Sequence, residues 1–151
     1  MKIEELINLS DNISNINFER ITDFDSKKQL TDSFDIEYNN QHGVYIFEHN
    51  IEGIIYIGSS GKIDSQNKKT KQGIRLRILQ GRFPYMISNS EIKYNYLNGK
   101  YNNNRHLRNL TIYFNNLEGN NFFTLPTVLE HFLIQLYYNE TNKLTLINKK
   151  I

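Results

Sequence analysis

The sequence predicts an α+β fold in which a small mixed, mainly antiparallel β-sheet is flanked by helices. Two runs of β-branched and aromatic residues, 44–47 and 54–57, are separated by six mostly polar and turn-forming residues, which is the pattern of a β-hairpin. A similar run at 110–114 predicts another strand. Residues 125–138 place apolar side chains at helical spacing and predict the longest helix. A length of 151 residues suits a single domain, 1–151, with one core.

Shorter elements are predicted around these. Residues 2–9 fit a short amphipathic helix, and residues 73–80 contain good helix formers. The small residues 59–61 predict a turn, and the apolar run 144–147 predicts a last strand. The region 18–36 alternates apolar positions with acids and supports no assignment.

The predicted C-terminal helix carries one carboxylate beside its apolar stripe. The stripe consists of Val128, Leu129, Phe132, Leu133 and Leu136. Glu130 lies at its margin, where a carboxylate can face a cleft and bind a divalent cation such as Mg²⁺. The alternative is a capping box, since Thr127-x-x-Glu130 fits that pattern. If Pro126 is already helical, Thr127 cannot be the cap and this alternative weakens.

Composition excludes several classes of protein. The chain has no cysteine, which rules out disulfides and thiolate metal sites. No run of apolar residues is long enough for a transmembrane helix, and the N-terminus does not resemble a secretory signal, so a cytoplasmic location is expected. The four histidines show no metal-binding spacing, and neither a Walker loop nor a G-x-S-x-G motif occurs.

Charge is concentrated in one segment. The whole chain carries only +2, but residues 59–82 contain seven bases and one acid, Asp64, which gives +6. A basic patch beside the hairpin is what a phosphate backbone attracts. A solvated lysine loop is the alternative.

The hairpin carries two tyrosines that are expected on one face. Side chains alternate along a strand, so Val44 and Ile46 share one face and Tyr45 takes the other. In the second strand Ile54 is expected to share a face with Tyr56. When the opposite face packs on the core, the two phenols emerge together and could form a site. The alternative is that tyrosine is simply a good strand residue.

The order Gly43-Val44-Tyr45, ten residues, Tyr56-Ile57-Gly58 resembles the signature of the GIY-YIG nuclease superfamily. The resemblance continues with a helix that bears an arginine at Arg77, a glutamate at Glu130 within L-E-x-x-L-I, and an asparagine at Asn148. These pieces occur in the family's order over residues 43–148, which would be the nuclease core. Residues 1–42 would be an N-terminal extension packed on or beside it.

This resemblance implies metal-dependent hydrolysis of DNA phosphodiester bonds. Its catalytic residues would be Tyr45, Tyr56, Arg77, Glu130 and Asn148, with Arg75 as the alternative arginine. Glu130 would bind Mg²⁺, for which Mn²⁺ can substitute. Arg77 would brace the phosphate, and Tyr45, assisted by Tyr56, would orient or deprotonate the attacking water. Contacts to double-stranded DNA would come from Ser59, Lys62, Lys68, Lys69, Lys71, Arg75 and Arg82.

The biological context stays open among several readings. Stand-alone members of the superfamily include restriction endonucleases, so a sequence-specific restriction-type enzyme is favoured. Such members are often dimeric, and a homodimer is one of the states left open. Repair, recombination and mobile-element nucleases are alternatives. Segment 83–109 mixes basic and aromatic residues and could contact DNA or simply pack. Gly81 stands where the family often has His or Tyr, and this favours a second class, a DNA-binding module without turnover.

Overall fold

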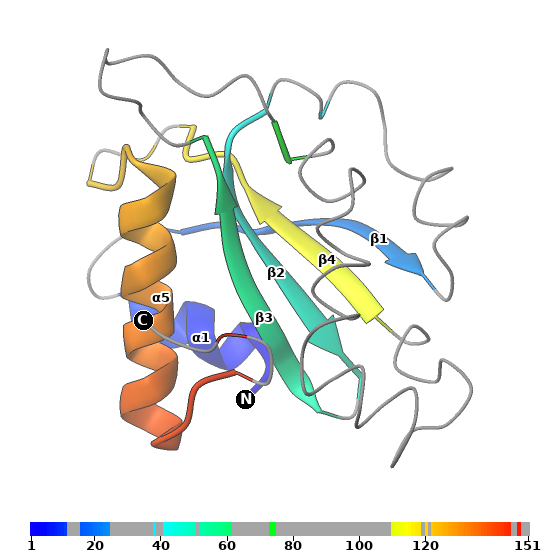
Figure 1. The fold of residues 1–151 in the computed structure, drawn as a ribbon, viewed down its shortest axis with the longest axis vertical. Coiled ribbons are helices and arrows are strands. Elements are labelled where there is room, and N and C mark those ends of the chain that lie inside the picture. The colour runs from blue at the N-terminus through cyan, green and yellow to red at the C-terminus, as the bar shows by residue number, and fades with distance from the viewer. Residues whose placement is uncertain are drawn as a thin grey trace.

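The computed structural model describes residues 1–11, 16–24, 38, 41–50, 52–61, 73–74, 110–118, 120, 122–145 and 148, with side chains for all of these except 22–24 and 110. Its elements are α1 (Ile3–Ser10), β1 (Glu19–Phe24), β2 (Gly43–His49), β3 (Gly53–Ser60), β4 (Leu110–Asn115) and α5 (Pro126–Thr141). They form a sheet with helices on one face (Figure 1). The predicted helix at 2–9, hairpin, strand at 110–114 and helix at 125–138 are confirmed within one to three residues.

The sheet has the strand order β1-β4-β2-β3. Each neighbouring pair is antiparallel, so the mainly antiparallel sheet is confirmed, while the described strands contain none of the parallel pairing of a mixed sheet. The region 18–36, which supports no assignment from sequence, supplies β1 at one edge. The other edge is β3, the second strand of the hairpin.

A β-bulge in the hairpin changes the predicted faces. Phe47 pairs with Tyr56, but Glu48 pairs with Ile54, so Ile55 is an extra residue in β3. A bulge shifts the alternation by one residue. Ile54 therefore shares the core face with Ile57, and the prediction that it shares a face with Tyr56 is wrong.

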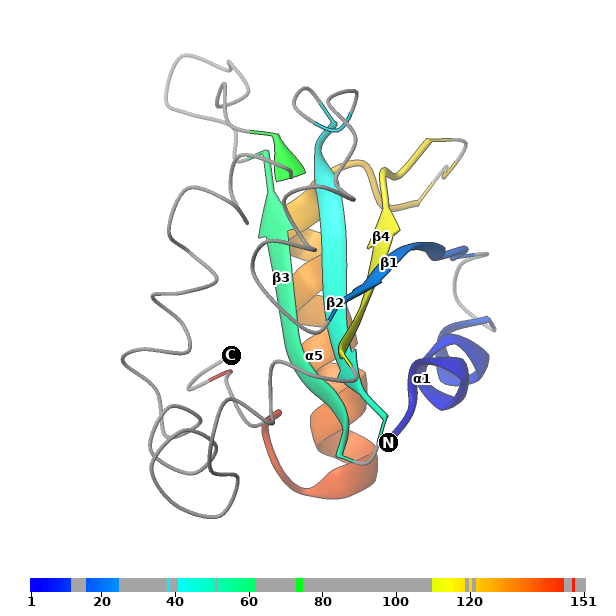
Figure 2. The same cartoon turned by 90° about the vertical axis from the view of Figure 1, so that its right-hand side faces the viewer.

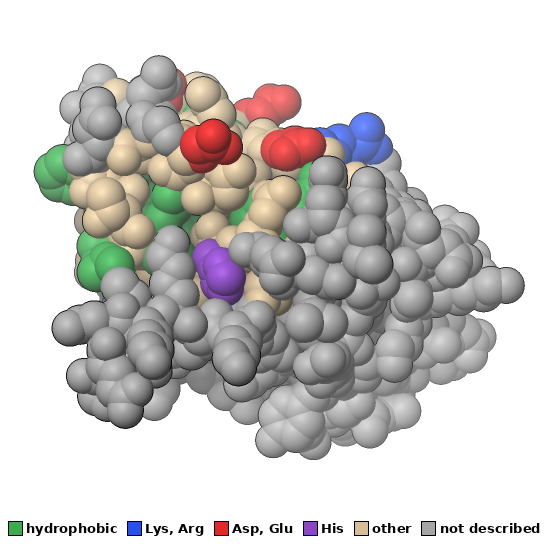
Figure 3. Space-filling view, turned by 90° about the horizontal axis from the view of Figure 1, so that it is seen from above, with side chains coloured by type: hydrophobic (Ala, Val, Ile, Leu, Met, Phe, Trp, Pro, Cys, Tyr) green, Lys and Arg blue, Asp and Glu red, His purple; other side chains and the backbone are tan. Residues whose placement is uncertain are grey.

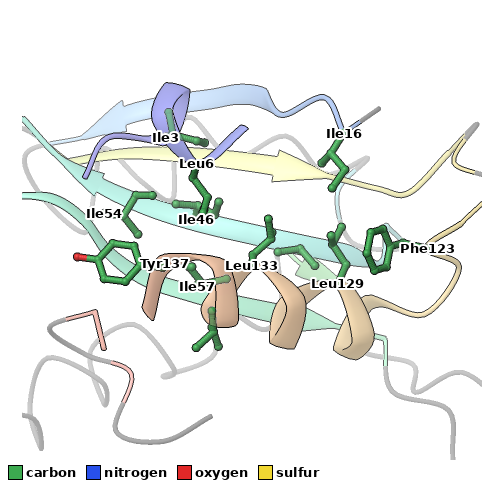
Figure 4. Packing of buried hydrophobic residues seen from close by; sticks show 12 residues of the cluster. Ile3, Leu6, Ile16, Ile46, Ile54, Ile57, Phe123, Leu129, Leu133 and Tyr137 are labelled. Atoms are coloured by element: carbon green, nitrogen blue, oxygen red, sulfur yellow. The ribbon is translucent and has the colours of Figure 1, made fainter. Parts of the chain in front are cut away.

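The core lies between the sheet and the two helices. Helix α5 runs along the face of β2 and β3, and α1 packs beside it (Figures 1 and 2). The buried cluster takes residues from all four elements (Figure 4). It comprises Ile3, Leu6, Ile16, Val44, Ile46, Ile54, Ile57, Phe123, Leu129, Leu133, Ile134 and Tyr137.

Helix α5 begins one residue later than predicted. Leu125 is its N-cap and Pro126 its first helical residue, so Thr127 cannot cap it and the capping-box interpretation of Glu130 is wrong. The buried face is also rotated relative to the predicted stripe. Ile134 and Tyr137 are buried, whereas Val128 is 49% exposed. This rotation moves Glu130 from the margin of the predicted stripe to a position between Tyr137 and Ile134 on the buried face, where its side chain is half-buried.

Residues 1–3 attach to the turn of the hairpin. The Ile54 N–H donates to the Met1 carbonyl at 2.8 Å, and the Ile3 N–H donates to the Glu48 carboxylate at 2.6 Å. Gly53 has φ 78°, and a side chain there would collide with the Met1 carbonyl at 2.3 Å. The N-terminal residues thus belong to the same packed unit as the hairpin.

Two predicted elements differ at their ends. Ser59 and Ser60, predicted to lie in a turn, belong to β3, which continues through Ser60. Leu144 and Thr145 are not in a strand, and residues 146 and 147 lie outside the described part. Of the predicted helix 73–80, the structure describes only 73 and 74. No helix in the described ranges has the length and apolar character needed to cross a membrane.

Candidate active site

Three successive residues of the edge strand β3 each contact a residue expected in the site. Ile57 is held by Asn148, Gly58 lies under the two phenols, and Ser59 is bonded to Glu130. Adjacent Cα atoms are about 3.8 Å apart, so these contacts fall within one short stretch of backbone. Residues that are far apart in the sequence therefore meet at residues 57–59, the last two residues of the Tyr-Ile-Gly motif and the serine that follows it.

The two phenols lie side by side, as expected. The rings of Tyr45 and Tyr56 have centroids 5.9 Å apart and an interplanar angle of 44°. Phe47 completes the cluster, with centroids 5.7 Å from Tyr45 and 5.9 Å from Tyr56. Tyr45 is only 1% exposed and Tyr56 is half-buried. These rings occupy the face of the sheet opposite α5.

Gly58 is needed because the phenols occupy the space that a side chain would take. A Cβ atom at Gly58 would lie 2.7 Å from Tyr45 Cζ, 2.8 Å from Tyr45 Oη and 2.6 Å from Tyr56 Cε1. Tyr45 pairs with Gly58 across β2 and β3. The ring of Tyr45 therefore extends from β2 across the neighbouring strand β3, on the face opposite α5. Its hydroxyl lies next to Gly58.

Glu130 reaches the same strand from the other face. The Ser59 hydroxyl donates a hydrogen bond to Glu130 Oε2, and Ser59 is only 4% exposed. Ser59 pairs with the core residue Val44, so both point toward α5. The edge strand thus lies between Glu130 and the phenols, which approach adjacent residues from opposite faces. The Ser59 hydroxyl, which the resemblance assigns to a DNA contact, is bonded to Glu130.

Asn148 binds the open edge of β3. Its Oδ1 accepts from the Ile57 N–H at 2.9 Å, and its Nδ2 donates to the Ile57 carbonyl at 3.0 Å. The Thr145 hydroxyl also donates to Oδ1. The carboxamide thus satisfies both backbone groups of one edge residue, as a neighbouring strand would. Its bonds are those of a residue that holds the strand end rather than one that contacts a substrate.

Ser60 is a buried residue next to these contacts that the sequence did not indicate as a candidate. It is 1% exposed, and its Oγ has no hydrogen-bond partner within the described part of the chain. An unsatisfied buried hydroxyl costs about 1–3 kcal/mol. Ser59 and Ser60 are identical residues in one strand, and no local pattern distinguishes the bonded hydroxyl from the unbonded one. Only the packing of α5 against one face does so.

The basic residues expected to bind DNA lie outside the described residues. These are Lys62, Lys68, Lys69, Lys71, Arg75, Arg77 and Arg82, together with Gly81 and the segment 83–109. The described surface seen from above displays acidic side chains prominently (Figure 3). A hollow at the ends of β1 and β4 is lined by Glu19, Glu118 and several asparagines, and none of its described lining residues is a base. Attraction of a phosphate backbone would therefore depend on the basic segment 59–82.

The donors present suit a hard divalent cation bound together with substrate. Nowhere in the described ranges do three or more His, Cys, Asp or Glu residues gather into a metal-binding group. Glu130 supplies one carboxylate, and Ser59 places a second oxygen beside it. Mg²⁺ is commonly held by one or two carboxylates, waters and substrate phosphates. This oxygen set fits Mg²⁺ or Mn²⁺ and does not fit zinc.

Comparison with known proteins returns no relative. The chain matches no protein-family model, no curated protein and no solved structure. The resemblance to the GIY-YIG superfamily therefore rests on the motif residues of the sequence.

Proposed function

We propose that this protein is a Mg²⁺-dependent endonuclease that hydrolyses phosphodiester bonds of double-stranded DNA, with a GIY-YIG-like site at residues 57–59 of β3. The meeting of Asn148, the two phenols and Glu130 on three consecutive residues of one strand carries this proposal. The motif order alone groups these four side chains, and in the structure each of them contacts this short stretch from one face or from the edge.

Glu130 and Ser59 form the acidic half of the proposed site. A bound Mg²⁺ would supply charge stabilisation at the scissile phosphate and at the leaving oxygen. Glu130 would hold it, because its carboxylate is half-buried beside the edge strand. The Ser59 hydroxyl restricts the carboxylate to one orientation. A fixed orientation matters because catalytic groups act through preorganised geometry.

Tyr45 and Tyr56 form the other half. A free phenol has a pKa of about 10 and is protonated at neutral pH. Tyr45 would therefore orient the attacking water, or would act as its base where a nearby cation lowers the phenol pKa. Arg77 is the expected source of that positive charge and of the contact to the phosphate.

A matched pair of glutamate variants on α5 tests the proposal. Supercoiled plasmid is incubated with wild type, E130Q and E140Q in Mg²⁺, in Mn²⁺ and in EDTA. Glu140 is an exposed residue of the same helix, so E140Q controls for the loss of one charge. We expect nicking or linearisation by wild type and E140Q in either metal, and none by E130Q. Metal-dependent cleavage that survives E130Q would overturn the assignment.

A DNA-binding module without turnover is the second candidate. The burial of Tyr45 favours it, since a ring that is 1% exposed has a clear packing role. Gly81 in place of His or Tyr favours it as well. The same experiment separates the two candidates, because a module retards plasmid in a gel and leaves it intact.

Among the nuclease reactions, restriction-type cleavage is the one we prefer. The proposed assembly for it is a homodimer. Restriction-type cleavage predicts discrete fragments of constant length from a long linear duplex, and cleavage that methylation of the site abolishes. A repair or recombination nuclease would instead cut flaps or branched duplexes and leave a linear duplex whole. A mobile-element nuclease would cut only one long, rare site.

A further inference from the structure

The hydroxyl of Ser60 is buried on the phenol face and has no hydrogen-bond partner among the described residues. Side chains alternate along β3, so Ser60 faces the same way as Gly58 and Tyr56, and opposite to Ser59. A buried polar group without a partner costs free energy, and alanine would fill the same place in a strand without that cost. The described contacts give this hydroxyl no folding role, which favours a role in binding a ligand.

The positions around Ser60 explain why it lacks a partner. Gly43 pairs with it across β2, and Gly58 precedes it by two residues on the same strand. Neither of these two positions offers a side chain to the Ser60 hydroxyl, because both are glycines. The Tyr45 hydroxyl extends over the preceding part of β3, where it lies next to Gly58.

The spacing of the two hydroxyl positions suits a tetrahedral oxyanion. Residues two apart in a strand have Cα atoms about 7 Å apart on one face. A hydroxyl above Gly58 and another on Ser60 can therefore donate to different oxygens of one phosphodiester, or both to one oxygen with modest movement of the phenol. Hydrogen bonds from a hydroxyl to a charged oxygen are stronger than those to a neutral oxygen.

We propose that Ser60 is a substrate-binding residue, whose hydroxyl donates to a non-bridging oxygen of a DNA phosphodiester that Tyr45 also contacts. This inference rests on the proposed function. Ser60 needs no role in the transfer of protons or in the metal site, since its hydroxyl faces away from Glu130.

The neighbouring serines provide a matched pair for the test. S60A, S59A and wild type are compared by urea unfolding and by binding to a short mixed-sequence duplex in Ca²⁺. S60C keeps nearly the same volume with a weak donor and serves if S60A does not fold. We expect S60A to be as stable as wild type or more stable, whereas S59A loses stability because its hydroxyl is bonded. We expect S60A and S60C to bind the duplex about tenfold or more weakly than wild type.

The outcomes separate the two proposals. If wild type binds or cuts DNA and S60A binds DNA equally well, the proposed role of Ser60 is wrong. The nuclease proposal then still stands. Loss of stability in S60A equal to that in S59A makes the hydroxyl structural and likewise overturns the inference. Wild type that neither binds nor cuts the duplex overturns the nuclease proposal, and the role of Ser60 with it.

Discussion

Ser59 and Glu130, 71 residues apart in the sequence, are joined by a hydrogen bond from the serine hydroxyl to the carboxylate. The bond connects the edge strand β3 to the second turn of α5, and the serine is buried. It takes the place of the helix cap that the local sequence around Glu130 would allow. The bond restricts the carboxylate to one orientation, which the proposed cation site requires.

Removal of the Ser59 hydroxyl should weaken both the packing of α5 and the metal site. We expect S59A to lower the free energy of unfolding by about 1–2 kcal/mol, since one hydrogen bond to a charged group is lost. We also expect weaker binding of Mn²⁺, measured from the EPR signal of free Mn²⁺ in a titration of the protein alone. S59T, which keeps the hydroxyl, should restore much of the affinity. Equal Mn²⁺ binding by wild type and S59A would show that the bond does not orient Glu130 for a cation.

Asn148 should protect the edge of the sheet. N148A removes both bonds to Ile57 and is expected to cost about 1–3 kcal/mol of unfolding free energy. N148D should be at least as harmful, because a carboxylate can accept from the Ile57 N–H but cannot donate to its carbonyl. Hydrogen exchange of the Ile57 amide should accelerate in both variants. Asn8, an exposed residue of α1, provides the control N8A. Unchanged exchange at Ile57 in N148A would contradict this role.

Gly58 should be required for the position of the phenols. A methyl group there would come within 2.6–2.8 Å of both rings, so G58A must displace them or the strand. We expect a loss of about 1–3 kcal/mol in stability, typical of overpacking. The near-UV circular dichroism of the tyrosines should change while the far-UV spectrum is retained. DNA cleavage should fall in parallel. A variant with native near-UV signal and full cleavage would mean that the rings adapt easily and that their position is not critical.

Stability should depend on pH through His49. Burial lowers the pKa of His49 below 6.5; Glu52 opposes this shift and Lys2 adds to it. Its Nδ1 accepts a hydrogen bond from the Glu52 N–H at 3.2 Å, which requires the neutral ring. On acidification the unfolded chain therefore takes up the proton first. The stabilisation is complete above about pH 6.5 and is lost as the pH falls toward the folded-state pKa.

Urea unfolding at several pH values measures this effect. H49N removes the titrating group and should flatten the dependence between about pH 7 and 5. The exposed His131 gives the control variant H131N, which should keep the wild-type slope. A wild-type slope in H49N would assign the pH dependence to other groups.

The hairpin, the strand at 110–114 and the two helices were predictable because their patterns are local. Period-two runs around Tyr45 and Tyr56 and helical spacing around Leu129 and Leu133 need no knowledge of distant residues. Extra residues in a strand follow no such rule. The bulge at Ile55, which moves Ile54 into the core, could not be read from the sequence.

Local pattern and motif order were enough to name the candidate site residues. These are the two tyrosines of the hairpin, the glutamate on α5 and Asn148. Tertiary structure alone decided how they are used. The Ser59 hydroxyl donates a hydrogen bond to Glu130, whereas the Ser60 hydroxyl has no partner among the described residues. Asn148 pairs with the backbone of Ile57, 91 positions away. The physical reason is that each role depends on which face of β3 is covered and which edge is open. That arrangement arises only when α5 and the residues after it pack against the strand.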